Sequence, residues 1–298
     1  MRILHLDAGK EMRGGQWQVL RLVEGLTAAG VESTLLARRD GPLLEAARQR
    51  RLRAASLTWA HLAVLGRRHD VVHAHDARTH TMAALVGGAP LVVARRVAFA
   101  VRTGLGSRWK YRRAARYLAV SEHVKQVLVA GGAARADEVA VVYDGVPVLP
   151  PAAGTRIVAP RDIGDPLKGP AMAQQAADLS GFSLCPSGNL EEDLKTAGVF
   201  VYITYSEGLG SAVLLAMSAG VPVVASNEGG LKEVIEHRAN GMLVENTPAA
   251  IGGAVRELIG NPEFARSLGQ AARQTISERF TVDRMVHATM EVYRQVLS

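Results

Sequence analysis

Short apolar runs alternate with amphipathic stretches along most of this chain, and this rhythm constrains the fold more than any other feature. The first half contains six runs that predict buried strands, at residues 2–6, 33–37, 70–74, 91–94, 117–120 and 139–143. Between the first two runs, residues 16–29 carry Val19, Val23 and Leu26 at helical spacing. Gly30, which follows them, is typical of a helix C-terminus. Buried strands that alternate with helices predict a parallel sheet covered on both faces.

A proline-rich segment interrupts this rhythm near the middle of the chain. Residues 147–154, PVLPPAAG, contain three prolines and a glycine, which indicates a linker between domains. A second alternation follows, with strands expected at 155–160, 182–186, 199–204 and 222–225 and helices expected at 169–179, 190–197 and 211–219. Residues 281–298 predict a final amphipathic helix. We therefore expect two α/β domains, at residues 1–148 and 154–280.

The composition is that of a globular protein. Of the 298 residues, 48% are hydrophobic and 21% are charged, which is typical of folded domains rather than disordered chains. No run approaches the ~20 apolar residues of a membrane span, and the first ten residues do not form a signal peptide. The single cysteine, Cys185, excludes an internal disulfide and a cysteine-based metal site. It favours a reducing, cytoplasmic location.

The charge is distributed unevenly. Residues 1–148 carry 23 Lys and Arg against 12 Asp and Glu, whereas residues 149–298 carry 12 against 16. A basic half indicates a polyanionic partner, for which anionic lipid, a phosphorylated acceptor and nucleic acid are candidates. The alternative is that the arginines are ordinary surface residues. Residues 107–118, SRWKYRRAARYL, interleave aromatic and basic side chains, which is compatible with a membrane-surface helix, with base stacking, or with a solvated helix whose aromatics pack inward.

The segment EGLGSAVLLAMSAGVPVVASNEGG, residues 207–230, carries the strongest functional signal. Glu207, Gly208 and Gly210 precede an apolar helix that a buried strand follows. Free N–H groups at a helix start bind anions, and glycines let a ligand approach the backbone. A carboxylate beside an anion site accepts hydrogen bonds from hydroxyls. The segment therefore predicts a site for a nucleotide-sugar.

Three motifs in the first half follow predicted strands, at the sheet edge where open α/β sheets bind ligands. Gly14 and Gly15 open the first helix, where a glycine pair lets N–H groups face a phosphate, although an ordinary turn is the alternative. His73 and His75 share one face of a strand. A metal pair is disfavoured because no third ligand lies nearby in the sequence, and backbone carbonyls are the expected partners of His73. Arg96 follows the next strand and either faces an anionic acceptor or is solvated.

The second half adds a pair of basic residues and an acidic turn. Arg161 and Lys168 lie on either side of a strand–helix loop, a placement that can clamp a diphosphate. The alternative is that they are exposed loop charges. Glu228, Gly229, Gly230 and Glu233 form a turn that we expect to line the same pocket.

Taken together, these motifs resemble those of the family 4 glycosyltransferases over nearly the whole chain. The resemblance rests on GGQWQVLRLVEGLTAAGVE, DVVHAHD, YLAVSEHVKQVLVAGG, VAVVYDGVP, EGLGSAVLLAMSAGVPVVASNEGGLKEVI and ERFTVDRMVHATMEVYRQVL. It implies the GT-B fold, in which two Rossmann-like domains face a cleft and the C-terminal helix crosses back to the first domain. It also implies a retaining, metal-independent transferase that uses a UDP-, GDP- or ADP-sugar as substrate and no cofactor.

The resemblance assigns roles to individual residues. The basic diphosphate pair corresponds to Arg161 and Lys168, and the glutamate that meets the donor sugar corresponds to Glu207. The remaining donor contacts correspond to Gly14, Gly15, Gly208, Leu209 and Gly210, to which we add Glu233. We expect Glu207, His75 and Arg96 to be the catalytic residues and expect no metal ligand.

The chain departs from the family pattern in three places. The second glutamate of the Glu-x7-Glu motif, which binds the ribose, is replaced by Leu215. Between Lys168 and Ala197 the chain is one βα unit short, so we expect a reduced second domain. Arg96 stands where the family has a histidine that helps position the sugar.

The sequence thus predicts a hexosyl- or heptosyltransferase that acts on an anionic or lipid-linked glycan acceptor of the lipopolysaccharide or exopolysaccharide type. We expect it in the cytoplasm, with peripheral contact to the anionic inner face of the membrane and with no nucleic-acid partner. A non-catalytic relative that binds sugar or a partner protein is the main alternative, because Leu215 replaces a glutamate. A nucleotide-sugar epimerase of similar architecture is a weaker one.

Overall fold

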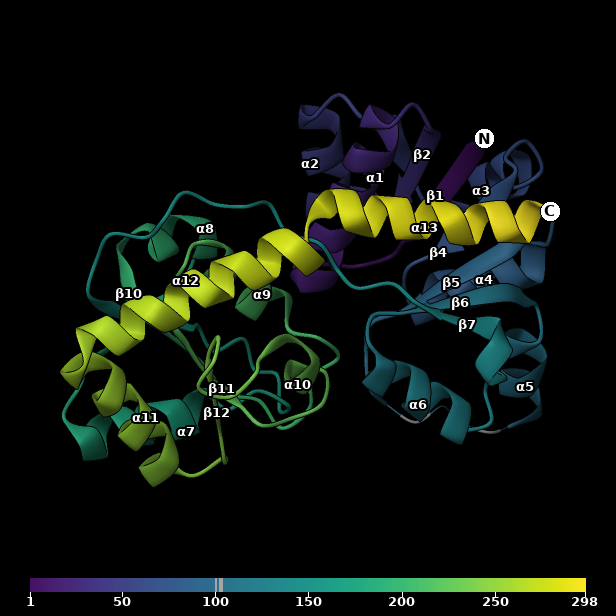
Figure 1. The fold of residues 1–298 in the computed structure, drawn as a ribbon. Coiled ribbons are helices and arrows are strands. Elements are labelled where there is room, and N and C mark those ends of the chain that lie inside the picture. The colour runs from purple at the N-terminus through teal and green to yellow at the C-terminus, as the bar shows by residue number, and fades with distance from the viewer. Residues whose placement is uncertain (100, 102–103) are drawn as a thin grey trace. The chain divides into compact units, whose positions relative to one another are not determined.

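A computed structural model describes residues 1–99, 101 and 104–298, which divide into two units. The first unit comprises Met1–Gly145 and Val282–Ser298, and the second comprises Val146–Thr281. Each is built on its own parallel sheet, and the ribbon in Figure 1 follows the chain through both. The expected α/β class with two Rossmann-like parallel-sheet domains is confirmed.

The first unit contains a seven-stranded sheet in the order β3-β2-β1-β4-β5-β6-β7. Its strands are β1 (Arg2–Asp7), β2 (Glu32–Ala37), β3 (Ala54–Ser56), β4 (Val71–Ala74), β5 (Leu91–Arg95), β6 (Ala114–Ala119) and β7 (Val139–Val141). Its helices are α1 (Gly14–Ala28), α2 (Pro42–Gln49), α3 (Trp59–Leu65), α4 (Ala77–Val86), α5 (Leu105–Tyr111), α6 (Glu122–Ala130), the 3-10 helix η1 (Ala136–Glu138) and α13 (Val282–Leu297). The order of the strands reverses between β1 and β4, and in sheets of this kind ligands bind beyond the strand ends at that point.

The second unit contains a five-stranded parallel sheet in the order β12-β11-β10-β8-β9. Its strands are β8 (Arg156–Pro160), β9 (Leu184–Ser187), β10 (Ala197–Tyr202), β11 (Val223–Ser226) and β12 (Met242–Val244). Its helices are α7 (Pro170–Ser180), α8 (Leu190–Asp193), η2 (Leu194–Thr196), α9 (Ser211–Ser218), α10 (Leu231–Val234), α11 (Pro248–Gly260) and α12 (Pro262–Arg279). None of the helices in the described part of the chain is long and apolar enough to cross a membrane.

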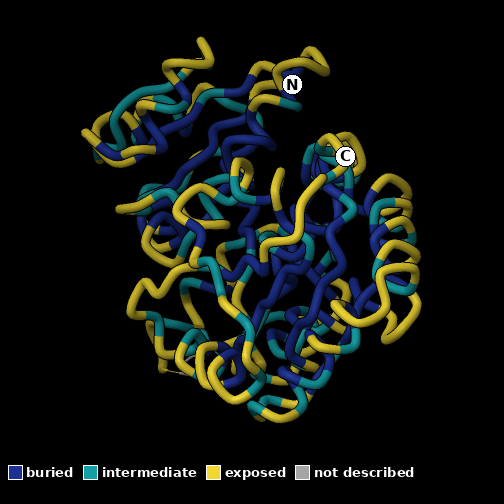
Figure 2. The backbone as a smooth tube through the Cα atoms, turned by 90° about the vertical axis from the view of Figure 1, so that its left-hand side faces the viewer, coloured by how far each residue is buried: buried dark blue, intermediate teal, exposed yellow. Residues whose placement is uncertain are grey.

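The C-terminal helix α13 is part of the core of the first unit. Its apolar residues Met285, Val286, Val292 and Tyr293 pack with α1 and with the middle of the seven-stranded sheet. Gly25 of α1 makes this packing close, because a Cβ at Gly25 would lie 2.6 Å from the side chain of Val286. Most residues of the strands are buried, and Figure 2 shows the buried stretches of the chain in the interior and the exposed stretches at the outside.

The segment expected as one basic surface element at residues 107–118 is divided between α5 and β6. The rings of Tyr111 and Tyr117 stack with their centroids 5.7 Å apart, and both are buried. Trp109 is 45% exposed. Residues 107–118 therefore do not form a single helix, because their second half enters the sheet as β6. Two of the three aromatic residues pack inward, as expected in the alternative of inward-packed aromatics.

Candidate functional site

The second unit brings Lys168 and Glu207 into direct contact. Lys168 lies just before α7, and Glu207 lies in the loop between β10 and α9. The Lys168 ammonium donates to Glu207 Oε2 at 2.6 Å, and its Nζ lies 2.8 Å from the hydroxyl of Tyr202. The Tyr202 hydroxyl also donates to Glu207 Oε2. One carboxylate oxygen therefore holds a cation and a phenol together at the start of α9.

The loop after Glu207 is shaped by glycines. Gly208 N donates to Glu207 Oε1 at 3.0 Å, which fixes the second carboxylate oxygen. Gly210 has φ +97°, a conformation that side chains rarely adopt, and it is the N-cap of α9 without any side-chain cap. A Cβ at Gly230 would lie 1.9 Å from the carbonyl oxygen of Gly208. The backbone of this turn is therefore tightly packed, and the first N–H groups of α9 have no side-chain acceptor at the cap.

The other residues expected in the donor site occupy different settings. Arg161 follows β8 and is exposed, and within the described part of the chain it forms no ion pair. Leu209 is buried, and Glu233 is partly buried in α10. The structure thus joins Lys168 to Glu207, whereas it leaves Arg161 at the solvent side of the loop that leads to Lys168.

Leu215 is a core residue of the second unit. It lies in α9 and is 5% exposed, between neighbours Leu214 and Ala216 that are fully buried. An apolar side chain in this setting accepts no hydrogen bond from a ribose hydroxyl. This part of α9 is therefore packed as core.

In the first unit, Arg96 lies beside two other residues that the sequence singles out, His75 and Gly15. Its Nε donates to Asp144 Oδ1 at 3.1 Å, and its Nη1 lies 3.3 Å from His75 Nδ1. A Cβ at Gly15 would lie 4.0 Å from Arg96 Cδ, so the start of α1 is adjacent. Arg96, His75 and Gly15 therefore form one cluster, with Asp144 as the counter-charge.

His75 continues into a cluster of buried imidazoles. His5 and His73 are paired in register on β1 and β4, and His75 follows on the same face. His5 Nδ1 lies 3.1 Å from His75 Nε2, and one nitrogen of each ring lies within 4.8 Å of the others. The expectation that no third ligand lies near His73 and His75 is wrong, because the neighbouring strand supplies His5. His73 Nδ1 contacts the Tyr293 hydroxyl at 2.6 Å and so does not depend on a backbone carbonyl.

The hydrogen-bond donors around these rings favour a chain of neutral imidazoles over a metal centre. A guanidinium can only donate, so His75 Nδ1 accepts from Arg96 and His75 Nε2 carries the hydrogen that it donates to His5 Nδ1. A metal-bound imidazole instead carries its hydrogen on the nitrogen that faces its second partner. At His75 Nδ1 that second partner is Arg96, which is itself a hydrogen-bond donor and carries a positive charge.

Burial keeps these imidazoles uncharged. It lowers the pKa of His5 to about 3, with the charges of His69 and Arg96 acting in the same direction. It also lowers the pKa of His73 and His75 well below 6.5, and Arg96 adds to both shifts. The pKa of Asp7, at the end of β1, is raised by burial and by nearby Asp76. The carboxyl end of β1 and β4 therefore concentrates ionisable groups whose charged forms are disfavoured.

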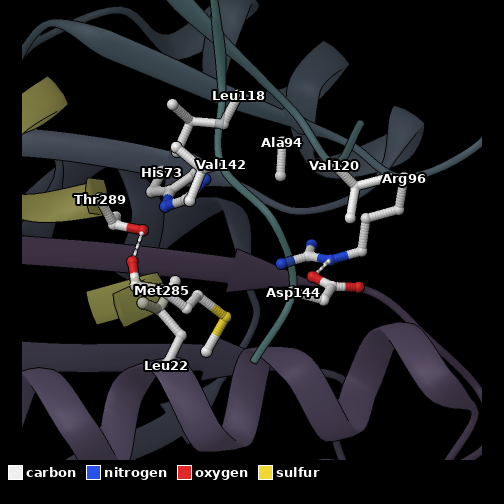
Figure 3. A pocket seen from close by; sticks show the side chains of 10 residues that line it. All are labelled: Leu22, His73, Ala94, Arg96, Leu118, Val120, Val142, Asp144, Met285 and Thr289. Carbon is white, nitrogen blue, oxygen red and sulfur yellow. Dashed lines mark hydrogen bonds and ion pairs between the residues drawn. The ribbon is translucent and has the colours of Figure 1, made fainter. Parts of the chain in front are cut away.

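Figure 3 shows a small cavity beside this cluster, lined by His73, Arg96, Asp144 and Thr289 together with apolar side chains. Its volume is about 20 Å³, enough for one water molecule. His73 Nε2 has no hydrogen-bond partner among the described residues. A polar cavity of this size beside an unpaired buried nitrogen is a suitable place for a bound water.

Four of these residues were not identified from the sequence. Tyr202 contacts Lys168 and Glu207, and Asp144 contacts Arg96. His5 contacts His75, and Tyr293 contacts His73. His5 was detectable, because it is a histidine at the centre of an apolar strand. Tyr293 was not, because it lies 220 residues from its partner.

Two family models match the chain, one in each unit. The model described as Glycosyltransferase Family 4 matches residues 12–148, and the model described as Glycosyl transferases group 1 matches residues 180–275. Curated relatives match over a little more than a third of this chain. α-Maltose-1-phosphate synthase of Mycolicibacterium smegmatis is 35% identical over 120 residues, which is 38% of this chain and 31% of that protein. N-acetyl-α-D-glucosaminyl L-malate synthase of Bacillus anthracis is 29% identical over 110 residues, 37% of this chain and 29% of that protein.

Solved structures match over the full length. Anabaena HepE, in a complex with UDP-glucose, has a TM-score of 0.86 at 16% identity, and the match covers 99% of this chain and 100% of that one. The lipopolysaccharide outer core galactosyltransferase WaaB has a TM-score of 0.69 at 16% identity, with 99% and 100% covered. These likenesses show the GT-B fold.

The fold and the two family models support a glycosyltransferase of the GT-B class. The matched regions span about a third of the length of these curated relatives.

Proposed function

We propose that this chain is a retaining glycosyltransferase that moves a hexose or heptose from a nucleotide-sugar to a lipid-linked or polysaccharide acceptor in the cytoplasm. The observation that carries the proposal is the contact between Lys168 and Glu207 at the start of α9. A cation beside open helix N–H groups suits a diphosphate, and the adjacent carboxylate suits the sugar hydroxyls. UDP-sugars are the first donors to test, because HepE, of the same fold and length, was solved with UDP and with UDP-glucose.

In this proposal the protein itself stabilises the leaving group. Negative charge develops on the diphosphate as the glycosidic bond breaks, and preorganised cations and N–H groups lower the energy of that state. Lys168, Arg161 and the first turn of α9 supply those groups, so no metal ion is needed for charge neutralisation. Arg96 and His75, in the first unit, are the proposed contacts of the acceptor or sugar.

One observation favours a non-catalytic relative as a second candidate. Leu215 is buried in the core, where the family motif has a glutamate for the ribose. Such a protein would bind a nucleotide-sugar without turning it over. Donor binding without transfer to any acceptor would support this candidate.

Nucleotide binding by the second unit tests the proposal. Calorimetry with UDP, GDP and ADP and with their sugars should identify a ligand, and that ligand should raise the melting temperature. Lys168→Ala removes a charge-assisted contact worth ~1.5–3 kcal/mol, so affinity should fall about 10- to 100-fold. Lys195→Ala is the control, because Lys195 forms an exposed ion pair with Glu192 in the same unit. Equal affinity in Lys168→Ala and the wild type would exclude the proposed donor site.

We further propose that the acceptor is reached at an anionic membrane through the α5 surface, defined by Leu105, Arg108, Trp109, Arg112 and Arg113. Leu105 is 87% exposed, Trp109 is 45% exposed, and the Arg113 guanidinium lies over the Trp109 ring at 5.9 Å. Arg108 and Arg112 line a pocket of about 220 Å³ with Tyr111 and the end of α6. Exposed apolar and aromatic side chains among arginines suit an interface rich in anionic headgroups.

Vesicle sedimentation tests this surface. The protein should bind vesicles that contain phosphatidylglycerol and not neutral phosphatidylcholine vesicles, and the binding should weaken as salt is added. Trp109→Ala should reduce binding, whereas Trp59→Ala, at a tryptophan of α3 that is 54% exposed, should not. Binding to both vesicle types alike would reject the electrostatic contact.

A further inference from the structure

Tyr202 is the group that joins the cation and the carboxylate of the candidate donor site. It ends β10 and is 7% exposed, and its hydroxyl contacts both Lys168 Nζ and Glu207 Oε2. The Lys168 ammonium also lies 5.0 Å from the centre of the Tyr202 ring. A phenol has one hydrogen to donate and an oxygen that accepts. Tyr202 therefore donates to Glu207 and accepts from Lys168.

In this arrangement Glu207 and a bound diphosphate compete for the Lys168 ammonium. Its ammonium is neutralised by Glu207 at 2.6 Å, and the Glu207 side chain is only 14% exposed. A diphosphate that binds Lys168 draws the ammonium away from that carboxylate. Glu207 then keeps two donors, the Tyr202 hydroxyl on Oε2 and Gly208 N on Oε1. A largely buried carboxylate needs such donors, because a buried polar group without a hydrogen-bond partner is costly.

We infer that Tyr202 is a positioning residue that holds Glu207 in place for the sugar once the donor diphosphate has engaged Lys168. The inference rests on the proposed function, and it adds a coupling between diphosphate binding and sugar recognition. Burial and the charge of Glu207 raise the pKa of Tyr202 well above 10, so its hydroxyl keeps its hydrogen at neutral pH.

The Tyr202 ring packs against a neighbouring aromatic ring on the same strand. Phe200 lies two residues earlier on β10 and is fully buried, and its ring stacks on that of Tyr202 with centroids 6.2 Å apart. Tyr202→Phe preserves the ring and its stacking and removes only the hydroxyl. The substitution therefore tests the contacts of the hydroxyl with Lys168 and Glu207 separately from the packing of the ring.

The experiment measures two affinities on each protein, one for UDP and one for the UDP-sugar that binds the wild type best. Their ratio reports what the sugar contributes, and it does not change when part of a sample is unfolded. In Tyr202→Phe the affinity for UDP should stay within about threefold, whereas the contribution of the sugar should fall about tenfold. Tyr205→Phe, at an exposed tyrosine of the same loop, should leave both unchanged.

Repeating the measurement in a Glu207→Gln protein tests whether Tyr202 acts through Glu207. If Tyr202 acts through Glu207, Tyr202→Phe should have no further effect on the ratio in a Glu207→Gln protein. An unchanged ratio in Tyr202→Phe, or an equal loss of affinity for UDP and the UDP-sugar, would overturn the inference and leave the proposed function standing. A wild type that binds no nucleotide or nucleotide-sugar would instead overturn the proposed function itself.

Discussion

The first unit should lose stability steeply as the pH falls from 7 to 5, because it buries four uncharged imidazoles, three in the His5 cluster and a fourth at His80 of α4. His5, His73 and His75 have a pKa near 6.5 when the chain is unfolded and a lower pKa when it is folded, about 3 in the case of His5. Below pH 6.5 the unfolded chain therefore binds protons that the folded chain does not. The contribution of these histidines to the free energy of unfolding is fully present above that pH, and it declines as the pH falls towards the pKa values of the folded state.

The magnitude follows from the linkage of proton binding to folding. Each such group contributes ~1.4 kcal/mol per pH unit below 6.5, which amounts to about 2 kcal/mol between pH 7 and pH 5. The three clustered imidazoles together amount to about 6 kcal/mol, and His80, whose pKa is lowered by burial to about 4, adds about 2 kcal/mol. The sum is comparable to the whole free energy of unfolding of many domains. The raised pKa of Asp7 acts in the opposite direction and offsets part of this loss.

Urea unfolding at pH 8, 7, 6 and 5 measures the effect, with tryptophan fluorescence as the probe. All three tryptophans, Trp17, Trp59 and Trp109, lie in the first unit, so the signal is specific to it. His5→Leu has its own cost at pH 8, but the difference between pH 8 and pH 5 should shrink by about 2 kcal/mol. His287→Gln, at an exposed histidine of α13, is the control. The same pH difference in His5→Leu and the wild type would refute the reasoning.

Two substitutions in the second unit give further expected outcomes. Leu215→Glu places a carboxylate among the buried residues of α9, so the free energy of unfolding should fall by several kcal/mol and the melting temperature should drop sharply. The affinity for nucleotide should not rise. A stable variant that binds UDP more tightly would show instead that the pocket reaches this position. Gly230→Ala must displace the carbonyl of Gly208, which a Cβ would approach to 1.9 Å, so nucleotide affinity and thermal stability should both fall, as calorimetry and thermal melting would show; Gly253→Ala, where a Cβ meets nothing within 4 Å, is the control.

The strands of both sheets were largely predictable because buried parallel strands read as apolar runs. The run at 33–37 corresponds to β2 (Glu32–Ala37), and the run at 222–225 corresponds to β11 (Val223–Ser226). The short edge strands β3 and β12 were missed; β3, with the sequence AAS, contains no large apolar residue. The start of β6 was placed three residues late, because Arg116 interrupts the apolar run.

The candidate site was predictable in its main chain and less so in its side chains. EGLG identified the turn before α9, because glycines and a helix start are visible in the sequence. The partners of the ionisable groups were not visible. Asp144 reaches Arg96 across 48 residues, and Tyr202 faces Lys168 across 34, so their contacts depend on strand order rather than on spacing.

Each unit holds its principal cation against a carboxylate, Arg96 against Asp144 and Lys168 against Glu207. An anionic ligand must compete with that carboxylate, so a phosphate alone gains less from either cation than it would from an unpaired one. A ligand that also offers hydroxyls can satisfy the carboxylate that it displaces. A nucleoside diphosphate sugar has both groups, whereas pyrophosphate has only the first. Under the proposed function, self-paired cations of this kind would select for the sugar as well as for the charge, which is the discrimination that a transferase needs before its donor reacts.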